Sequence, residues 1–198
     1  MGKITDIRIV KKELRAKFRK IRESFDPAFK KEYDSAIQRK FLSSNIYQEA
    51  KTILCFISTN LEVETRGIIK QAFLDKKTVA VPKCLNKNGK MKFFIITSFD
   101  DLEESTFSLL EPNIKKCKEI KDFSYSICIL PGFAFDREGY RIGFGKGYYD
   151  RFLNKYDGIK VAICYNECIV SSLPRGRYDI AADYIVTQKY ILTTQKTK

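Results

Sequence analysis

Short apolar, β-rich runs alternate with helix-like segments along this 198-residue chain. The runs are TILCFIS at 52–58, KTVAVPKC at 77–84, KMKFFIIT at 90–97, YSICILPGFAFD at 125–136, IKVAICY at 159–165 and DYIVT at 183–187. Several are apolar at consecutive positions, as is typical of strands buried on both faces. ETRGIIKQAFLDK at 64–76 and GYYDRFLNKY at 147–156 are helical in pattern. We therefore expect a three-layer α/β fold with a mostly parallel central sheet and helices on both faces.

Two further helices are expected before the first strand. Apolar residues recur at helical spacing from Ile7 to Ile21, with Arg and Lys between them, so 7–22 is predicted to be a basic amphipathic helix. Asp26 suits an N-cap and Pro27 a first helical position, which predicts a second helix over 27–49. Both should pack on the sheet.

Proline and glycine set the expected ends of two strands. Pro82 is expected to end its strand, and Asn88-Gly89 predicts a turn before the next one. The charged segment 98–122 is expected to be mostly irregular, and 190–198 a loose tail. Because there is no internal repeat and no low-complexity linker, we expect one α/β domain over 1–198.

Composition narrows the class of protein. Hydrophobic residues make up 44% of the chain, which is a globular composition. The sequence shows no secretory signal and no apolar run near the roughly 20 residues that a membrane helix needs. We therefore expect a cytoplasmic protein with no membrane partner, and a monomer.

Cysteine and histidine usage excludes several chemistries. The chain has six cysteines and no histidine, and no two cysteines have CxxC spacing. Reduced thiols are expected, and a structural zinc site is not. The absence of histidine also excludes nucleophiles activated by a histidine base.

The formal charge of +13 indicates anionic partners but does not select one. Nucleotides, phosphorylated or carboxylated metabolites and nucleic acid all fit. Nucleic-acid binding is the main alternative to an enzyme, because the first helix is basic and tyrosines lie among basic residues. It lacks an RNP, KH or helix-turn-helix signature and leaves a glycine-rich stretch unexplained.

That stretch is DREGYRIGFGKGYYDRF, at 136–152. Gly143, Gly145 and Gly147 alternate there, after a predicted strand and before a predicted helix. Main-chain amides without neighbouring Cβ atoms can approach phosphate oxygens closely. The spacing fits neither the P-loop nor the Rossmann G-x-G-x-x-G pattern, so we expect a Rossmann-like fold without that fingerprint.

LPGFAFDREGYRIGFGKGYYDRFL, at 130–153, resembles the signature of the 5-formyltetrahydrofolate cyclo-ligase (5,10-methenyltetrahydrofolate synthetase) family. KKELR at 11–15, FISTNLEVET at 56–65 and LPRGRYDIAADYIV at 173–186 stand in the family's order. The resemblance covers about Lys11 to Val186. It implies cyclisation of 5-formyltetrahydrofolate, with or without a polyglutamate tail, to 5,10-methenyltetrahydrofolate. ATP is the co-substrate and Mg²⁺ the metal in this reaction of one-carbon metabolism.

The resemblance also implies site residues. The ATP-binding set would be Lys11, Lys12, Arg15, Arg141, Ile142, Gly143, Phe144, Gly145, Lys146, Gly147, Tyr148 and Tyr149. Lys146 and Arg141 would be catalytic. A solvated basic face is the alternative for Lys12, and core packing is the alternative for one of the two tyrosines.

Folate and metal contacts follow in the same way. Folate would contact Glu62, Phe56, Phe133, Tyr148 and Tyr149, and Mg²⁺ would be bound by Asp150 and Asp183. The chain departs from the family at Leu61, where Asp is common, and at Tyr178, where His is common. A family member that acts on another formyl or carboxylate substrate is a further alternative.

Overall fold

The computed structural model describes residues 6–86, 89–105 and 109–194. Within these ranges the main sheet has the strand order β12-β11-β9-β6-β1-β2-β3. Its strands are β1 (Thr52–Leu54), β2 (Thr78–Cys84), β3 (Met91–Ile96), β6 (Ser126–Leu130), β9 (Ile159–Ile163), β11 (Tyr184–Val186) and β12 (Ile191–Thr193). The five inner strands are parallel to one another. At the edges, β3 pairs antiparallel with β2, and β12 pairs antiparallel with β11. The predicted mostly parallel sheet is confirmed.

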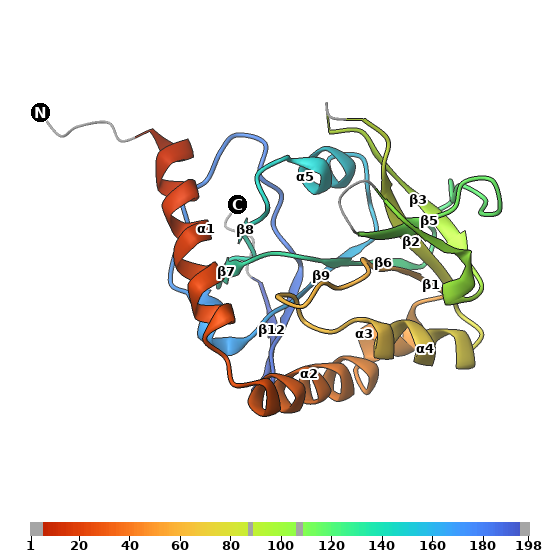
Figure 1. Ribbon diagram of the computed structural model, residues 1–198, viewed down its shortest axis with the longest axis horizontal. Helices are drawn as coiled ribbons and strands as arrows, with labels where there is room; N and C mark the ends of the chain where they lie inside the picture. The colour runs from red at the N-terminus through yellow and green to blue at the C-terminus, as the bar shows by residue number, and fades with distance from the viewer. Residues whose placement is uncertain (1–5, 87–88, 106–108, 195–198) are drawn as a thin grey trace, which may run out of the picture.

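Helices cover both faces of this sheet (Figure 1). The helices α2 (Pro27–Leu42), α3 (Asn45–Glu49) and α4 (Arg66–Leu74) lie on one face, and α5 (Tyr148–Leu153) lies on the other. The predicted three-layer α/β architecture is therefore confirmed. A single domain over 1–198 stays a prediction.

Helix α1 (Ile7–Glu23) stands at one end of the layers, beside a small second sheet (Figure 1). This sheet has the order β10-β7-β8 and consists of β7 (Ala134–Asp136), β8 (Arg141–Ile142) and β10 (Ile169–Val170). A hairpin of β4 (Leu102–Glu104) and β5 (Leu110–Pro112) and two 3-10 turns, η1 (Phe99–Asp101) and η2 (Asn166–Cys168), complete the described elements.

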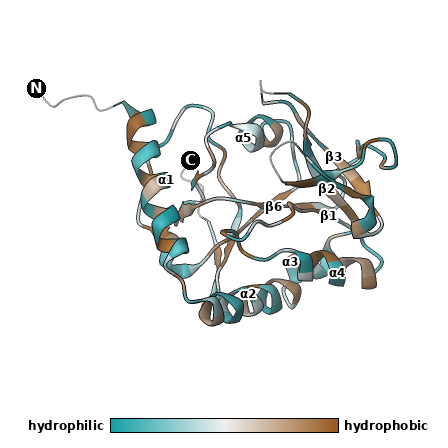
Figure 2. Ribbon diagram, viewed as in Figure 1, coloured by the Kyte–Doolittle hydropathy of each residue, from teal (hydrophilic) through white to brown (hydrophobic). Residues whose placement is uncertain are grey.

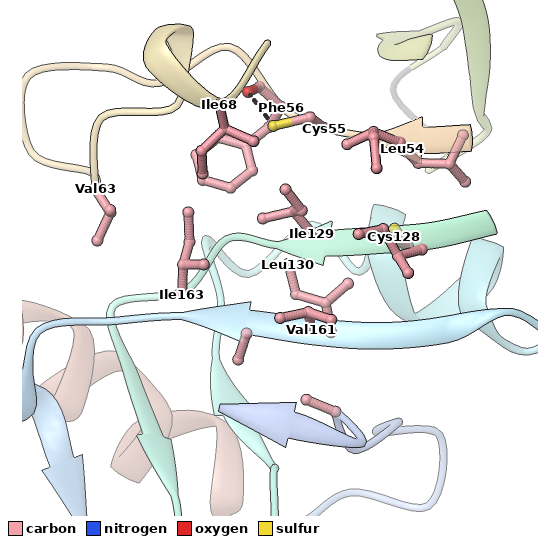
Figure 3. Close-up of a cluster of buried hydrophobic side chains, with 14 of the residues drawn as sticks. Leu54, Cys55, Phe56, Val63, Ile68, Cys128, Ile129, Leu130, Val161 and Ile163 are labelled. Atoms are coloured by element: carbon pink, nitrogen blue, oxygen red, sulfur yellow. Dashed lines mark hydrogen bonds between the residues drawn. The ribbon is translucent and has the colours of Figure 1, made fainter. Parts of the chain in front are cut away.

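The core lies around the central strands. Figure 3 shows Leu54 from β1, Ile129 and Leu130 from β6 and Val161 from β9 packed together, and all four are buried. In the hydropathy view, apolar colour concentrates on the central strands, and α1 and α2 are striped (Figure 2). Continuously apolar strands fit this position because both of their faces meet other elements. No described helix is long and apolar enough to cross a membrane.

The predicted helix over 27–49 is wrong as one element. α2 ends at Leu42, and α3 begins at Asn45 after Ser43 and Ser44. The Ser44 hydroxyl accepts a hydrogen bond from the Tyr47 amide at 3.3 Å and so caps α3. Serine side chains compete with helical hydrogen bonds in this way, which explains the break.

Two expected strand bounds also differ. β1 ends at Leu54, and 55–58 is irregular, because the chain turns there towards α4. Strand β2 continues through Pro82 to Cys84. β1 pairs with β2 only as far as Ala80, so the missing N–H of Pro82 faces no partner strand on that side.

Residues 125–136 form two strands, β6 and β7, because the chain turns at Pro131 and Gly132. The predicted loose tail over 190–198 is wrong for its first part, since β12 pairs antiparallel with β11. Leu192 packs against the core there. Residues 195–198 lie outside the described ranges, as does Asn88 of the predicted turn.

Candidate active site

Helix α1 meets the glycine loop, residues 143–147, at the end of the molecule where β8 leads into α5. Arg15 Nε donates a hydrogen bond of 2.8 Å to the Gly143 carbonyl. A Cβ on Gly145 would lie 3.1 Å from the Arg15 guanidinium, and the φ of Gly145 is +94°. Glycine is therefore favoured at 145 by its backbone conformation, and Arg15 packs closely against it. The structure brings together two segments that are separate in the sequence.

The tip of the glycine loop faces solvent. Phe144 and Lys146 are exposed, and Gly147 starts α5 in the left-handed conformation with φ of +69°. The Phe144 ring packs against Phe133, with 4.7 Å between ring centroids. Lys146 therefore presents a mobile positive charge next to unobstructed main-chain amides.

Arg141 and Asp150 form an ion pair behind the loop. Arg141 Nη2 lies 2.8 Å from Asp150 Oδ1, and the Arg141 side chain is 5% exposed. The same guanidinium donates to the Ile180 carbonyl at 2.8 Å, and the Ile180 amide donates to Asp150 at 3.2 Å. The pair fixes the Asp150 carboxylate at the first turn of α5, where it remains about a quarter exposed.

The two tyrosines that begin α5 have different surroundings. Tyr148 Oη donates to the Asn86 carbonyl at 2.8 Å, on the β2–β3 side of the loop. Tyr149 Oη is buried and has no hydrogen-bond partner among the described residues. Burial raises the pKa of Tyr149 well above its usual value, so the hydroxyl stays protonated. A buried hydroxyl without a hydrogen-bond partner is uncommon in folded proteins.

Glu62 lies on the loop after β1 and is 6% exposed. Its Oε2 accepts from the Thr59 amide at 2.8 Å and from the Thr59 hydroxyl at 2.9 Å. Burial raises the pKa of Glu62, while these hydrogen bonds and the charge on Arg22 act to lower it. Burial is the main cause of the raised pKa of Tyr149, and the charge on Glu62 adds to it. Phe56 and Phe133, the predicted aromatic contacts, are both buried.

The remaining predicted residues lie further from the loop tip or have other partners. Lys11 forms an ion pair with Asp179, whereas Lys12 is exposed. Asp183 Oδ2 accepts from the Lys160 amide and lies 2.9 Å from Lys160 Nζ, at the start of β9 and β11. The described residues contain no group of three or more metal-ligating side chains. The roles of all these site residues stay predictions.

Sequence reasoning missed two residues that touch this region. Asp179 pairs with Lys11 although 168 positions separate them, and no sequence pattern indicates that pairing. Arg22 contacts main-chain carbonyls of two loops near Glu62 and Phe133. In the sequence it cannot be distinguished from the other basic residues of the first helix.

Comparisons with known proteins agree with the geometry. The model of the 5-formyltetrahydrofolate cyclo-ligase family matches residues 8–188. The Arabidopsis thaliana protein named 5-formyltetrahydrofolate cyclo-ligase, mitochondrial, is 30% identical over 203 residues, which cover 89% of this chain and 73% of that protein. The Mus musculus 5-formyltetrahydrofolate cyclo-ligase is 29% identical over 161 residues, covering 76% and 79%. Because the plant relative is named mitochondrial, the cytoplasmic location of this chain stays a prediction.

A solved structure is also similar. The NMR structure of Aquifex aeolicus 5,10-methenyltetrahydrofolate synthetase has a TM-score of 0.84 at 26% identity, covering 96% of this chain and 95% of that one. A Mycoplasma pneumoniae 5,10-methenyltetrahydrofolate synthetase shares the fold, with a TM-score of 0.71 at 21% identity over 90% of this chain and 98% of that one. The family model, the relatives and the fold point the same way, and the chain belongs to the 5-formyltetrahydrofolate cyclo-ligase family.

Proposed function

We propose that this chain uses ATP and Mg²⁺ to close 5-formyltetrahydrofolate into 5,10-methenyltetrahydrofolate, with release of ADP and phosphate. Membership of the cyclo-ligase family supports the cyclisation itself. The observation that carries the nucleotide part is the hydrogen bond from Arg15 to Gly143, which joins the basic helix to the glycine loop. This contact makes one cationic, amide-rich surface from two distant segments.

The glycine loop and α1 would bind the phosphates. Amides at Gly145 and Gly147 are unobstructed by Cβ atoms, and Lys146 is exposed between them. A flexible lysine can follow a phosphoryl group as it moves from one oxygen to another. Arg15 holds the loop against α1, so the amides are positioned before ATP binds.

The chemistry needs positioning more than a side-chain nucleophile. The γ-phosphoryl group of ATP passes to the formyl oxygen, which forms an O–P bond and releases ADP. N10 of the folate then attacks the formyl carbon, and the C–O bond breaks as phosphate leaves. Phosphorylation improves a poor leaving group, and positive charge near the transferred group stabilises the transition state. This scheme accounts for a site without histidine.

Glu62 and Tyr149 would bind the folate. Glu62 is held through Oε2 by Thr59, so Oε1 is the oxygen that can accept from an N–H of the pterin or of the formyl-bearing region. The buried Tyr149 hydroxyl supplies a donor for a second polar atom. Phe133 and Phe144 add aromatic surface beside the loop.

The carboxylate of Asp150 fits Mg²⁺, which usually takes one or two carboxylates together with substrate phosphates. It lies in the first turn of α5, next to the glycine loop, and Arg141 fixes its orientation. When bound, the ion would neutralise phosphate charge. Asp183 is the second predicted ligand, and it forms an ion pair with Lys160. A magnesium titration of an Asp183→Asn variant tests this assignment.

The decisive experiment mixes the purified protein with 5-formyltetrahydrofolate and MgATP and follows the absorbance of the methenyl product. We expect formation of the chromophore, its loss when ATP is omitted, and its loss when EDTA removes Mg²⁺. If a folded protein gives no product, the proposed function is wrong. If product forms without ATP, the nucleotide part of the proposal is wrong.

A further inference from the structure

Arg22 lies near the end of α1 and is buried, with 4% of its surface exposed. Its Nη1 donates to the Leu61 carbonyl at 3.0 Å, and its Nη2 donates to the Phe133 carbonyl at 3.0 Å and to the Gly132 carbonyl. These carbonyls belong to two loops that follow the carboxyl ends of β1 and β6. One side chain therefore ties two loops to a third element.

Each loop contains a residue predicted to contact folate, Glu62 in the first and Phe133 in the second. Arg22 binds the carbonyl of Leu61, which precedes Glu62, and the carbonyl of Phe133. The Tyr165 hydroxyl, which donates to Asp34 Oδ1 at 2.7 Å, also lies 3.1 Å from the Glu62 carbonyl oxygen. The Arg22 guanidinium also lies 5.6 Å from the centroid of the Phe133 ring.

The buried Arg22 guanidinium is not fully satisfied by hydrogen bonds among the described residues. Among the described residues none forms an ion pair with Arg22, and its Nε is buried without a hydrogen-bond partner. Burying a cation with incomplete hydrogen bonding costs free energy. What the guanidinium provides is a planar fork of donors, which can bind carbonyls on separate segments at fixed angles.

We propose that Arg22 is a positioning residue for the folate side of the reaction. It sets the distance between the Glu62 loop and the 132–133 loop, and thereby how far Glu62 lies from Phe133. This inference rests on the proposed function, because it assigns Arg22 to the binding of the folate and leaves ATP binding to the glycine loop.

The test compares Arg22→Lys with Arg19→Lys. The first keeps the charge but removes the fork, since an ammonium group cannot bind both loops at the same angles. Arg19 is exposed on the same helix, 5.5 Å from the centroid of the Phe133 ring, and serves as the matched control. For Arg22→Lys we expect KM for 5-formyltetrahydrofolate to rise at least tenfold while KM for ATP stays within twofold. Arg19→Lys should leave both constants within twofold of wild type.

Direct folate binding, followed by the quenching of tyrosine fluorescence, should weaken by the same factor in Arg22→Lys. Equal increases in both KM values would overturn the proposal, as would unchanged constants or failure of the variant to fold at 25 °C. Wild-type protein that binds folate without cyclising it contradicts the proposed function. In that case the tenfold loss of binding still supports the role of Arg22, and unchanged binding overturns it. Wild-type protein that neither binds nor cyclises the folate overturns both.

Discussion

A cleft of about 500 Å³ opens at the amino ends of the inner strands β1, β6 and β9. The candidate active site lies at the other, carboxyl ends of these strands. Its lining includes Glu49, Asp122, Asp157, Lys155 and the 72% exposed Tyr125. The glycine loop and several buried polar groups lie at the carboxyl ends of the strands. The segments of the family signature lie elsewhere, at the carboxyl ends of the strands and on α1.

The polar groups at the two ends differ in their environment. Asp122, in the cleft, has its pKa lowered by hydrogen bonds from the hydroxyl and amide of Ser124. At the carboxyl ends of the strands, burial raises the pKa of Glu62, and the Tyr149 hydroxyl is buried without a partner among the described residues. Local hydrogen bonds stabilise the charged form of Asp122, whereas the burial of Glu62 costs free energy. That cost is a better indication of chemistry than cavity size.

The largest expected contrast is between two lysines. Lys146→Ala should reduce kcat by about 10²–10³-fold, because it removes a positive charge from the proposed site of phosphoryl transfer. Lys155→Ala, in the cleft, should stay within twofold of wild type. Initial rates of methenyl formation measure both, and circular dichroism checks the fold. A Lys146→Ala variant with near wild-type turnover would remove this loop from the mechanism.

Two tyrosines give a smaller contrast, in stability. Tyr149→Phe removes a buried hydroxyl that lacks a partner, so the free energy of unfolding should rise by about 1 kcal/mol. Its KM for the folate should increase at the same time. Tyr125→Phe should change the free energy of unfolding by less than about 0.5 kcal/mol, because that side chain is exposed. Urea unfolding provides the measurement, and destabilisation by Tyr149→Phe would show that the hydroxyl is satisfied in solution.

The smallest expected effect is a pH dependence at Glu62. Its pKa in the folded protein is raised from the ordinary value of 4.5, so the folded state binds a proton more readily than the unfolded state. The wild-type protein therefore loses stability, relative to Glu62→Gln, as pH rises from about 4.5 through the folded pKa. We expect the difference in Tm between Glu62→Gln and wild type to grow by on the order of 2 °C between pH 4 and pH 7.

A parallel Asp122→Asn variant at the amino end should show the opposite slope, since the pKa of Asp122 is lowered. Its difference in Tm from wild type should become less favourable as pH rises towards the ordinary pKa of 3.8, and should then stay level up to pH 7. Thermal scans at matched ionic strength measure both series. A Glu62→Gln difference that shrinks with pH would contradict a raised pKa.

The sequence was sufficient for the parts of this molecule that depend on local pattern. Continuous apolar runs such as 126–130 predicted a buried parallel sheet, and the alternating glycines predicted the loop that meets Arg15. The pairing of β12 with β11 could not be read from pattern, because it depends on packing of a short edge strand against a formed sheet. Arg22 was missed because its partners are main-chain carbonyls, which leave no trace in side-chain identity.

The contacts of α1 have a consequence for how the enzyme becomes active. Arg15 and Gly143 are 128 positions apart, and Lys11 and Asp179 are 168 apart. Contacts between such distant positions close large loops, which costs conformational entropy. The proposed nucleotide site therefore depends on docking of the first helix against segments 128 and 168 positions away. A chain cleaved between them could keep its central strands and still lose that site.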